Sequence, residues 1–389
     1  MSLNKPSHSP DILYLAHDLG DPAVRKRVAM LQDGGARLRV AGFRRAEKPF
    51  SDVAGCAPID LGRTHNGRFA QRACAVLRQV LSSQPGLSGG ADIIVARNLE
   101  MLAVAARVRA SMPRPPVLIY ECLDIHRLLL NDGLPGAALR RLEGWLAAKA
   151  SALITSSPAF VGAYFSSRSR VRLPVRLIEN KVYDPAGGME AAASPSRPAG
   201  PPWKIGWFGV IRCRKSLLML ADLVARSQGK VEVVIRGRPA LDQIPDFHDI
   251  VSQTPGIRFF GAYRYPDDLP EIYGGVHFTW AVDFYEDGSN SSWLLPNRLY
   301  EGGLFNAVPI AVKSVVTGDY LDRLNIGVTL GAPVSESLSR FFGSLTADRY
   351  RSLESRSAEA PRSQWRHDQD ECRSLVRYLA SLQPVPSGS

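Results

Sequence analysis

The chain has 389 residues, which is long for a single hydrophobic core, so we expect two domains. With 45% hydrophobic and 22% charged residues it has the composition of a soluble globular protein. We see no apolar run of about 18 residues and no signal peptide, which argues against a membrane-spanning protein. The net charge of +11 predicts a negatively charged partner: nucleic acid, anionic lipid or a nucleotide phosphate.

The first half of the chain alternates short apolar runs with stretches of helical periodicity. We expect strands at residues 11–16, 37–42, 93–96, 117–122, 152–155 and 175–179. We expect helices from Pro22, over residues 67–83, from about residue 98 to 110, and over residues 139–150. Strands that alternate with helices in this way predict a doubly wound α/β domain over residues 1–184.

A change of composition separates the two halves. Residues 185–202, PAGGMEAAASPSRPAGPP, lack aromatic side chains and periodicity, and predict an interdomain linker. The alternation then restarts, with strands expected at 204–209, 231–235, 257–261, 276–282, 307–312 and 327–330 and helices at 216–225 and 266–273. We predict a second α/β domain over residues 203–366, with a ligand in the cleft between the domains at the carboxyl ends of the strands.

The most informative stretch is PNRLYEGG at residues 296–303, which an apolar strand follows directly. A helix that begins near Asn297 points its free N–H groups and the positive end of its dipole at whatever precedes it. Arg298 and Glu301 are three residues apart and share a helical face. This pattern suits a ligand with phosphates at one end and sugar hydroxyls at the other. The alternative is a surface helix with an ordinary Arg–Glu pair.

A second candidate is the stretch GWFGVIRCRKS at residues 206–216, where a strand runs through Gly209 into a basic loop and a helix expected from Ser216. Glycine allows a backbone to approach a ligand closely, and a helix start offers N–H groups to an anion. Arg212, Arg214 and Lys215 could neutralise a diphosphate. The spacing is neither that of a dinucleotide-binding GxGxxG motif nor that of a P-loop. The alternative is a basic surface turn.

Polar residues follow three predicted strands of the first domain. They are His17 and Asp18, Arg97 and Asn98, and Asp124 with His126. Asp124 is a candidate general base, and a histidine that lines a cleft can act in catalysis. Taken one at a time, such residues more often cap a turn.

Other classes of site have little support. The five cysteines have no CxxC spacing, which argues against a disulfide framework or a zinc site and for a reducing cytosol. The DQD sequence at residues 368–370 is typical of helix capping rather than metal binding, and GxSxG is absent. The helices at 67–83 and 139–150 combine basic with apolar side chains and could rest on anionic lipid, although a solvated helix is an equal alternative.

Together these motifs resemble those of GT-B glycosyltransferases, close to the retaining family 4 group and to succinoglycan-type exopolysaccharide transferases. The stretches that carry the resemblance are IIVARNLEML, VLIYECLDIH and ALITSSPAF in the first half. In the second half they are GWFGVIRCRKS, FFGAYRYPDDLPEIYGGVHFTW and LLPNRLYEGGLFNAVPIAV. The resemblance implies two Rossmann-like domains that face each other across a cleft. It also implies that residues 367–389 form a helix that crosses back to the first domain, followed by a tail.

The resemblance assigns roles to matching positions. It implies catalytic or acceptor-side roles for Asp124, His17 and Asp18. It implies that the donor diphosphate and sugar contact Gly209, Arg212, Arg214, Lys215, Asn290, Ser291, Asn297 and Arg298. Glu301 would bind the ribose, and Tyr263 and Arg236 would border the base. No metal or cofactor is expected beyond the nucleotide sugar, a UDP- or GDP-linked substrate.

One position departs from the retaining pattern, in which two glutamates are separated by seven residues. The partner of Glu301 should be residue 293, which is Trp293 here. An inverting mechanism with Asp124 as the base therefore stays open beside the retaining one.

The function that we predict is sugar transfer from a nucleotide diphosphate sugar to a lipid-linked saccharide in surface polysaccharide synthesis. The enzyme would be cytoplasmic and peripheral on the anionic inner face of the cytoplasmic membrane. An epimerase of the same fold is one alternative, which a requirement for an added acceptor would distinguish. A basic nucleic-acid-binding protein is another, but no helix-turn-helix, zinc-finger or RNP motif is visible, so we expect no nucleic acid partner.

Overall fold

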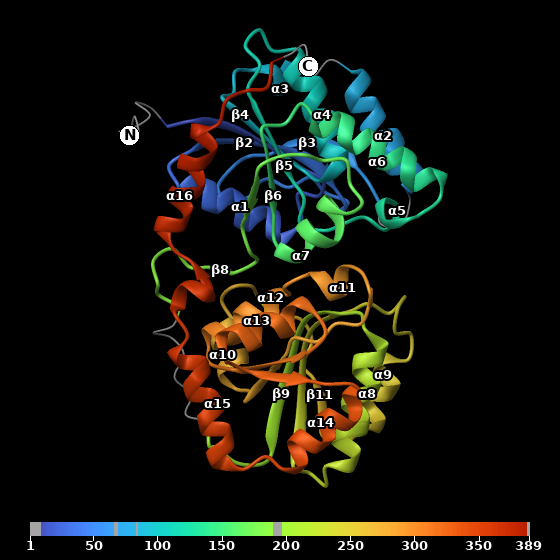
Figure 1. The fold of residues 1–389 in the computed structure, drawn as a ribbon, viewed down its shortest axis with the longest axis vertical. Helices are drawn as coiled ribbons and strands as arrows, with labels where there is room; N and C mark the ends of the chain where they lie inside the picture. Colours follow the sequence, from blue (N-terminus) through green and yellow to red (C-terminus); the bar gives the residue numbers. More distant parts are fainter. Residues whose placement is uncertain (1–8, 66–68, 83–84, 190–196, 387–389) are drawn as a thin grey trace. The chain divides into compact units, whose positions relative to one another are not determined.

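The computed structural model describes residues 9–65, 69–82, 85–189 and 197–386. The chain divides into two compact units, Met1–Glu179 with Asp368–Ser389, and Asn180–His367. Each unit is a parallel sheet covered by helices, which confirms the predicted doubly wound α/β class (Figure 1). The division falls at Asn180, five residues before the stretch that the sequence predicts as a linker.

The sheet of the first unit has the strand order β3-β2-β1-β4-β5-β6-β7. Its strands are β1 (Asp11–Ala16), β2 (Arg37–Arg44), β3 (Ile59–Arg63), β4 (Ile93–Arg97), β5 (Val117–Glu121), β6 (Ala152–Thr155) and β7 (Val175–Leu177). Every residue of β4, β5 and β6 is buried. Helices cover both faces of a parallel sheet, which is why these strands read as continuous apolar runs. The edge strand β3 was not expected, because its sequence IDLGR is short and half polar.

The helices of the first unit lie in two groups. They are α1 (Pro22–Asp33), α2 (Phe69–Leu81), α3 (Pro85–Ser88), α4 (Asn98–Ala110), α5 (Arg127–Leu130), α6 (Leu134–Ala147), α7 (Pro158–Phe160), the π-helix η1 (Val161–Ser166) and α16 (Gln369–Ser381). Helices α2, α4 and α6 pack side by side on one face, and α16 packs on α1 (Figure 1). The ends of the helix predicted at 67–83 lie outside the described residues.

The sheet of the second unit has the order β11-β10-β9-β12-β13-β14. Its strands are β9 (Trp203–Ile211), β10 (Val231–Pro239), β11 (Ile257–Phe259), β12 (Phe278–Trp280), β13 (Val308–Val312) and β14 (Val328–Leu330), and β8 (Val182–Tyr183) pairs separately with β15 (Arg366–His367). The helices are α8 (Arg214–Arg226), α9 (Phe247–Gln253), α10 (Leu269–Gly274), α11 (Asn290–Trp293), α12 (Asn297–Leu304), α13 (Val316–Leu324), α14 (Val334–Gly343), α15 (Ala347–Glu359) and the 3-10 helix η3 (Arg362–Gln364).

Two boundaries differ from those expected near the candidate residues. Helix α8 begins at Arg214 rather than Ser216, because the Cys213 side chain serves as the N-cap and its Sγ accepts from the backbone N–H of Ser216. Strand β10 continues through Gly237, which lies opposite Gly209 of β9. A Cβ on Gly237 would fall 1.8 Å from the Gly209 carbonyl oxygen, so only glycine lets the two strands pair this far.

The described ends of the predicted linker are held by the second unit. The Asp184 carboxylate accepts from the backbone N–H groups of Gly188 and Met189 and forms an ion pair with Arg366 at 3.3 Å. Arg197 donates to the carbonyl oxygens of Phe305 and Asn306, each at 3.1 Å. Residues 190–196 lie outside the described part of the chain.

No helix within the described residues has the length and apolar character needed to cross a membrane.

Candidate functional site

Each sheet reverses its strand order at one point, between β1 and β4 in the first unit and between β9 and β12 in the second. Ligands of open α/β sheets bind in the crevice outside the carboxyl ends of the strands at such a switch point. His17 follows β1 and Asn98 follows β4, while Arg212 follows β9 and the Asp283 segment follows β12. The topology therefore places the predicted candidates of both units at the expected edge of each sheet.

In the second unit the two basic motifs meet at one carboxylate. Asp283 lies 3.4 Å from a terminal nitrogen of Arg212 and 4.0 Å from one of Arg298. The Arg212 guanidinium also stacks 4.6 Å from the Tyr285 ring centre, and the Asp283 carboxylate accepts from the backbone N–H of Tyr285. The loop after β9 and the start of α12 thus form one cluster of positive charge around a single acid.

Glu301 lies in a ring of tyrosines. Its side chain is 5% exposed, and the Tyr273 hydroxyl donates to its Oε2 at 2.7 Å. Burial raises the pKa of Tyr263 and of Tyr265, and the nearby charge of Glu301 raises both further. The Glu301 carboxylate is therefore surrounded by phenols held in their neutral form, and its oxygens can accept hydrogen bonds from ligand hydroxyls.

The two glycines after Glu301 fix its helix against the sheet. A Cβ on Gly302 would lie 2.3 Å from the Thr279 side chain, and one on Gly303 would lie 2.4 Å from the Trp365 ring. The backbone of α12 can approach β12 at Gly302 and the Trp365 ring at Gly303 only because both positions lack a side chain. The EGG sequence thus has a packing reason that the helical pattern alone does not reveal.

The other predicted donor residues surround the same cluster. Gly209 has a φ of +109° and open space at its Cβ position. Lys215, in the first turn of α8, lies 4.1 Å over the Phe284 ring and 3.8 Å from Asp287. Arg214 is instead held to Asp246 by two side-chain nitrogens, which directs it to the N-terminal end of α9.

The remaining donor candidates differ in what their side chains contact. Asn290 donates to Glu286 Oε2 at 2.7 Å, and the Ser291 hydroxyl accepts from the Glu286 backbone N–H at 2.9 Å, so both shape the α11 turn. Asn297 is exposed at the first position of α12. Arg236, within β10, lies 5.3 Å from the Phe260 ring centre and 3.6 Å from Glu271.

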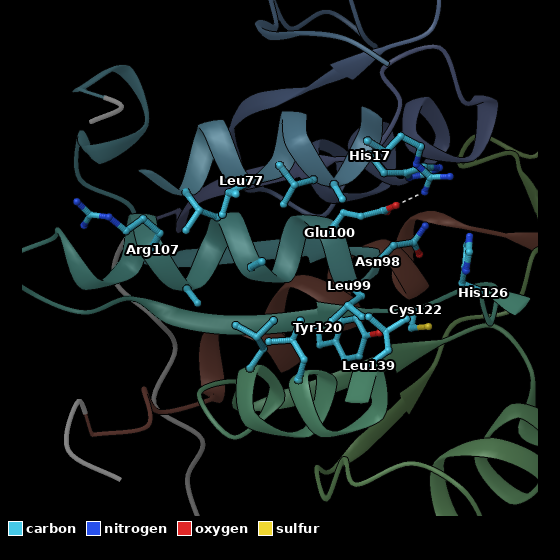
Figure 2. A pocket seen from close by; sticks show the side chains of 18 of the residues that line it. His17, Leu77, Asn98, Leu99, Glu100, Arg107, Tyr120, Cys122, His126 and Leu139 are labelled. Carbon is cyan, nitrogen blue, oxygen red and sulfur yellow. Dashed lines mark hydrogen bonds and ion pairs between the residues drawn. The ribbon is translucent and has the colours of Figure 1, made fainter. Parts of the chain in front are cut away.

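In the first unit, residues from three strand ends line one groove. His17, Asn98 and His126 lie at one end of a cavity of about 680 Å³ that continues along α2, α4 and α6 (Figure 2), and Asp124 also lines this cavity. The set of strand ends that the sequence singled out is thus brought together by the fold. His126 is also the N-cap of α5, where its Nδ1 accepts from the backbone N–H of Leu128 at 3.2 Å.

Two of these polar groups have buried atoms without a hydrogen-bond partner. Among the described residues nothing bonds to His17 Nδ1 or to Asn98 Oδ1. Burial, with the charge of Arg97, lowers the pKa of His17 to about 3, so the imidazole is neutral at pH 7. Asn98 also has a φ of +68°, an uncommon conformation for a residue with a side chain. Unsatisfied buried groups and local strain of this kind concentrate at functional sites.

Asp18 has a different environment from His17. It is 8% exposed, and its carboxylate accepts from the Gly20 backbone N–H at 3.0 Å and lies 3.2 Å from Arg45 Nε. These contacts fix the turn between β1 and α1.

The first unit also contains a buried ionic cluster, of which the sequence singled out only Arg97. Glu121 Oε1 accepts from Arg27 at 2.6 Å, its Oε2 accepts from the Tyr14 hydroxyl at 2.5 Å, and Arg97 reaches the same carboxylate at 3.5 Å. Arg97 also pairs with Asp21, the N-cap of α1, at 3.0 Å. The sequence signal that could have revealed this cluster is Glu121, a charged residue at the end of the apolar run VLIYE. The cluster holds the β1–α1 turn, and hence His17, against β4.

No three His, Cys, Asp or Glu side chains in the described part of the chain lie close enough together to hold a metal ion. Independence from metal stays a prediction.

Comparison with known proteins decides the family. Residues 21–181 match the glycosyl transferase 4-like domain. Succinoglycan biosynthesis protein ExoL of Rhizobium meliloti (strain 1021) is 49% identical over 376 residues, which cover 95% of this chain and 93% of that protein. The chain belongs to the glycosyl transferase 4-like family. These matches confirm the family that the sequence motifs predicted.

Solved structures of low sequence identity share the fold of the glycosyltransferase. HepE of Anabaena, in a crystal structure with UDP and glucose, has a TM-score of 0.68 at 16% identity and covers 96% of this chain and 99% of its own. Sucrose-phosphate synthase of Thermosynechococcus elongatus has a TM-score of 0.68 at 14% identity, covering 95% and 98%. The predicted GT-B fold is confirmed.

Proposed function

We propose that this glycosyltransferase moves a sugar from a nucleotide diphosphate sugar to a lipid-linked saccharide in exopolysaccharide synthesis. The observation that carries the proposal is the meeting of Arg212 and Arg298 around Asp283 at the switch point of the second unit. Support for the pathway comes from the 49% identity to a succinoglycan biosynthesis protein, and support for the donor class from HepE, which was crystallised with UDP and glucose.

The donor has a distinct partner for each of its parts. Two guanidiniums and Lys215 supply positive charge for a diphosphate, and they stabilise it as a leaving group without a metal. Glu301 would accept from the ribose hydroxyls, and Tyr263 and Arg236 would border a uracil or guanine base. Gly209, Asn290, Ser291 and Asn297 complete the walls, while Arg214 acts through Asp246 on the shape of the loop.

On the acceptor side, Asp124 is the proposed base. It is exposed and lines the first unit's groove, where a carboxylate can take a proton from a hydroxyl of the acceptor. His17 and Asn98 would orient the acceptor, and Asp18 would hold their loop. An inverting displacement would use such a base and a stabilised diphosphate, and Trp293 at the position of the expected glutamate keeps this mechanism open beside the retaining one. We place the enzyme in the cytoplasm, peripheral on the inner face of the membrane.

The test compares two variants that should fail in different ways. Asp124→Asn should bind the nucleotide sugar normally, seen as an unchanged thermal shift with UDP- and GDP-sugars, but should lose at least about 100-fold in turnover. Glu301→Ala should instead raise the donor KM, with a smaller effect on kcat, because ribose binding is common to ground and transition states.

The control is Asp132→Asn, which removes an exposed carboxylate of the same unit, and it should behave as the wild type. Normal turnover of Asp124→Asn would remove Asp124 from the mechanism. An unchanged donor KM for Glu301→Ala would contradict the ribose assignment. A product that forms without any added acceptor would contradict transfer itself.

A further inference from the structure

The second unit has a further cavity, which is lined by the edge strand β14 and by helices α14 and α15. Figure 1 labels both helices in the part of the chain that follows β13. The volume of about 440 Å³ is of the size that holds a small ligand. In the sheet order β14 lies two places beyond β12 and three beyond β9, which is roughly 10 Å from β12 and roughly 14 Å from β9. None of the donor candidates lines this cavity.

The polar lining of this cavity is basic. Arg340 of α14 and Arg349 and Arg356 of α15 contribute guanidiniums, and no aspartate or glutamate among the described residues lines it. Four hydroxyl side chains complete the polar lining: Thr329, Ser337, Ser344 and Ser352. Guanidiniums and hydroxyls are the donors that phosphate oxygens accept from, and a guanidinium binds a phosphate through two parallel hydrogen bonds.

The three guanidiniums are not neutralised by carboxylates. Arg349 donates to the Ser344 hydroxyl at 3.0 Å and Arg356 donates to Asn325 Oδ1 at 2.9 Å, and both partners are neutral. Within the described part of the chain none of the three arginines forms an ion pair. By contrast, Arg351 of the same helix is paired with Asp348 at 2.9 Å. Like charges that share a cavity repel one another, so a bound anion would stabilise this arrangement.

Two of the guanidiniums are positioned without a ligand. The Arg349 guanidinium lies 5.1 Å from the ring centre of Phe341, which is buried. Arg356 Nε is also buried, and it has no hydrogen-bond partner among the described residues. A buried donor without a partner is costly and is one mark of a site that a ligand completes. Phe341 and Leu353 give the cavity an apolar lining, which strengthens the attraction between its charges and an anion.

We propose that this cavity binds a small ligand with two or more phosphate groups, which Arg340, Arg349 and Arg356 hold together with the hydroxyls around them. Three positive charges without a counter-charge match a diphosphate or triphosphate better than a single phosphate or carboxylate. The concave shape fits a small molecule, whereas a membrane or a nucleic acid is bound by an extended basic surface. The site is separate from the donor site and does not depend on the proposed function.

The experiment measures binding to the full chain by calorimetry, in metal-free buffer at physiological salt. The probes are inorganic phosphate, diphosphate and triphosphate. Each further phosphate adds charge-assisted hydrogen bonds to a guanidinium, so triphosphate should bind at least about tenfold more tightly than phosphate. Equally weak binding of all three probes would overturn the proposal.

Variants localise the binding, because the donor cluster could also take a phosphate probe. Arg340→Gln removes an exposed guanidinium of the cavity and should weaken triphosphate binding at least about tenfold. Arg212→Gln alters the donor cluster and should leave this binding in place. The matched control is Arg351→Gln, which removes the same charge from an exposed position outside the cavity and should change nothing.

Two results with these variants would contradict the proposal. Equal losses in Arg340→Gln and Arg351→Gln would show that only the diffuse charge of α14 and α15 attracts the probe. Loss of binding in Arg212→Gln but not in Arg340→Gln would assign the probe to the donor cluster alone.

A second pair of variants tests the cavity by adding a negative charge. Ser352→Glu puts a carboxylate at an exposed lining position, where it should compete for the guanidiniums and weaken triphosphate binding at least about tenfold. Ser355→Glu adds the same charge to an exposed position of α15 outside the lining and should keep the binding. Binding of anionic vesicles or nucleic acid that Ser352→Glu abolishes, in a protein that ignores triphosphate, would overturn the proposal in favour of those partners.

Discussion

His17 shows how burial tunes a single side chain. Its imidazole loses hydration and lies near Arg97, and both effects disfavour the charged form. A neutral imidazole with an unpartnered Nδ1 can accept a hydrogen bond from a sugar hydroxyl. Asp283 likewise joins the donor site because it pairs with Arg212 and Arg298, which lie 15 positions or more away in the chain.

The depressed pKa of His17 predicts a pH-dependent stability. The unfolded chain binds a proton at this histidine below about pH 6.5, whereas the folded protein binds one only near pH 3. The stabilisation is therefore present above pH 6.5 and is lost as the pH falls, at up to about 1.4 kcal/mol per pH unit.

The measurement is urea unfolding of the wild type and His17→Gln between about pH 7 and pH 5. The free energy of unfolding of the wild type should fall by about 2 kcal/mol more than that of His17→Gln over that range, because only the wild type has the titrating histidine. His248→Gln, at an exposed histidine of the second unit, is the control. Parallel curves for wild type and His17→Gln would show that His17 titrates normally.

At the scale of elements, α12 positions Glu301 because its backbone lies directly on β12 and the Trp365 ring. Gly303→Ala would place a methyl group about 2.4 Å from that ring, where the backbone of a packed helix has little room to move.

We expect Gly303→Ala to lower the free energy of unfolding by roughly 1–3 kcal/mol and to raise the donor KM through displacement of Glu301. Gly343→Ala is the matched control, since it lies in α14 of the same unit with open space around its Cβ position and should gain slightly from helix propensity. Denaturant unfolding and donor titration measure both effects. A Gly303→Ala protein as stable as Gly343→Ala would contradict the packing argument.

At the scale of the whole molecule, the last helix belongs to the first unit although it follows the second in the chain. Cys372, Leu375 and Leu379 of α16 are buried, and a Cβ on Gly34, the C-cap of α1, would fall 2.4 Å from the Cys372 carbonyl oxygen. The core of the first unit is therefore completed by a helix that follows the second unit in the chain.

Truncation after His367 should expose this apolar surface and destabilise the first unit by several kcal/mol, since three or more large side chains lose their burial. Hydrogen exchange should report faster opening of α1 and of the β1–α1 turn. Truncation after Pro386 removes only the last three residues and should leave exchange unchanged. Equal protection of α1 in both proteins would show that α16 contributes little.

The sequence by itself determined the class of the fold, because alternating apolar runs and helical periodicity are local properties. It also identified the strand-end polar residues and the PNRLYE and RCRK motifs, since each motif is contiguous. Local patterns did not reveal β3 or the early start of α8, because a half-polar edge strand and a cysteine N-cap carry weak signals. The roles of individual site residues stay predictions.

Only the tertiary structure decided which strand ends are neighbours, because strand order depends on pairings between distant segments. The order β3-β2-β1-β4-β5-β6-β7 puts His17 beside Asn98, and β11-β10-β9-β12-β13-β14 puts Arg212 beside Arg298 around Asp283. The apolar groove has the same origin. Its walls come from three helices that are separated in the sequence, α2, α4 and α6, and the sequence of each helix alone does not reveal the groove.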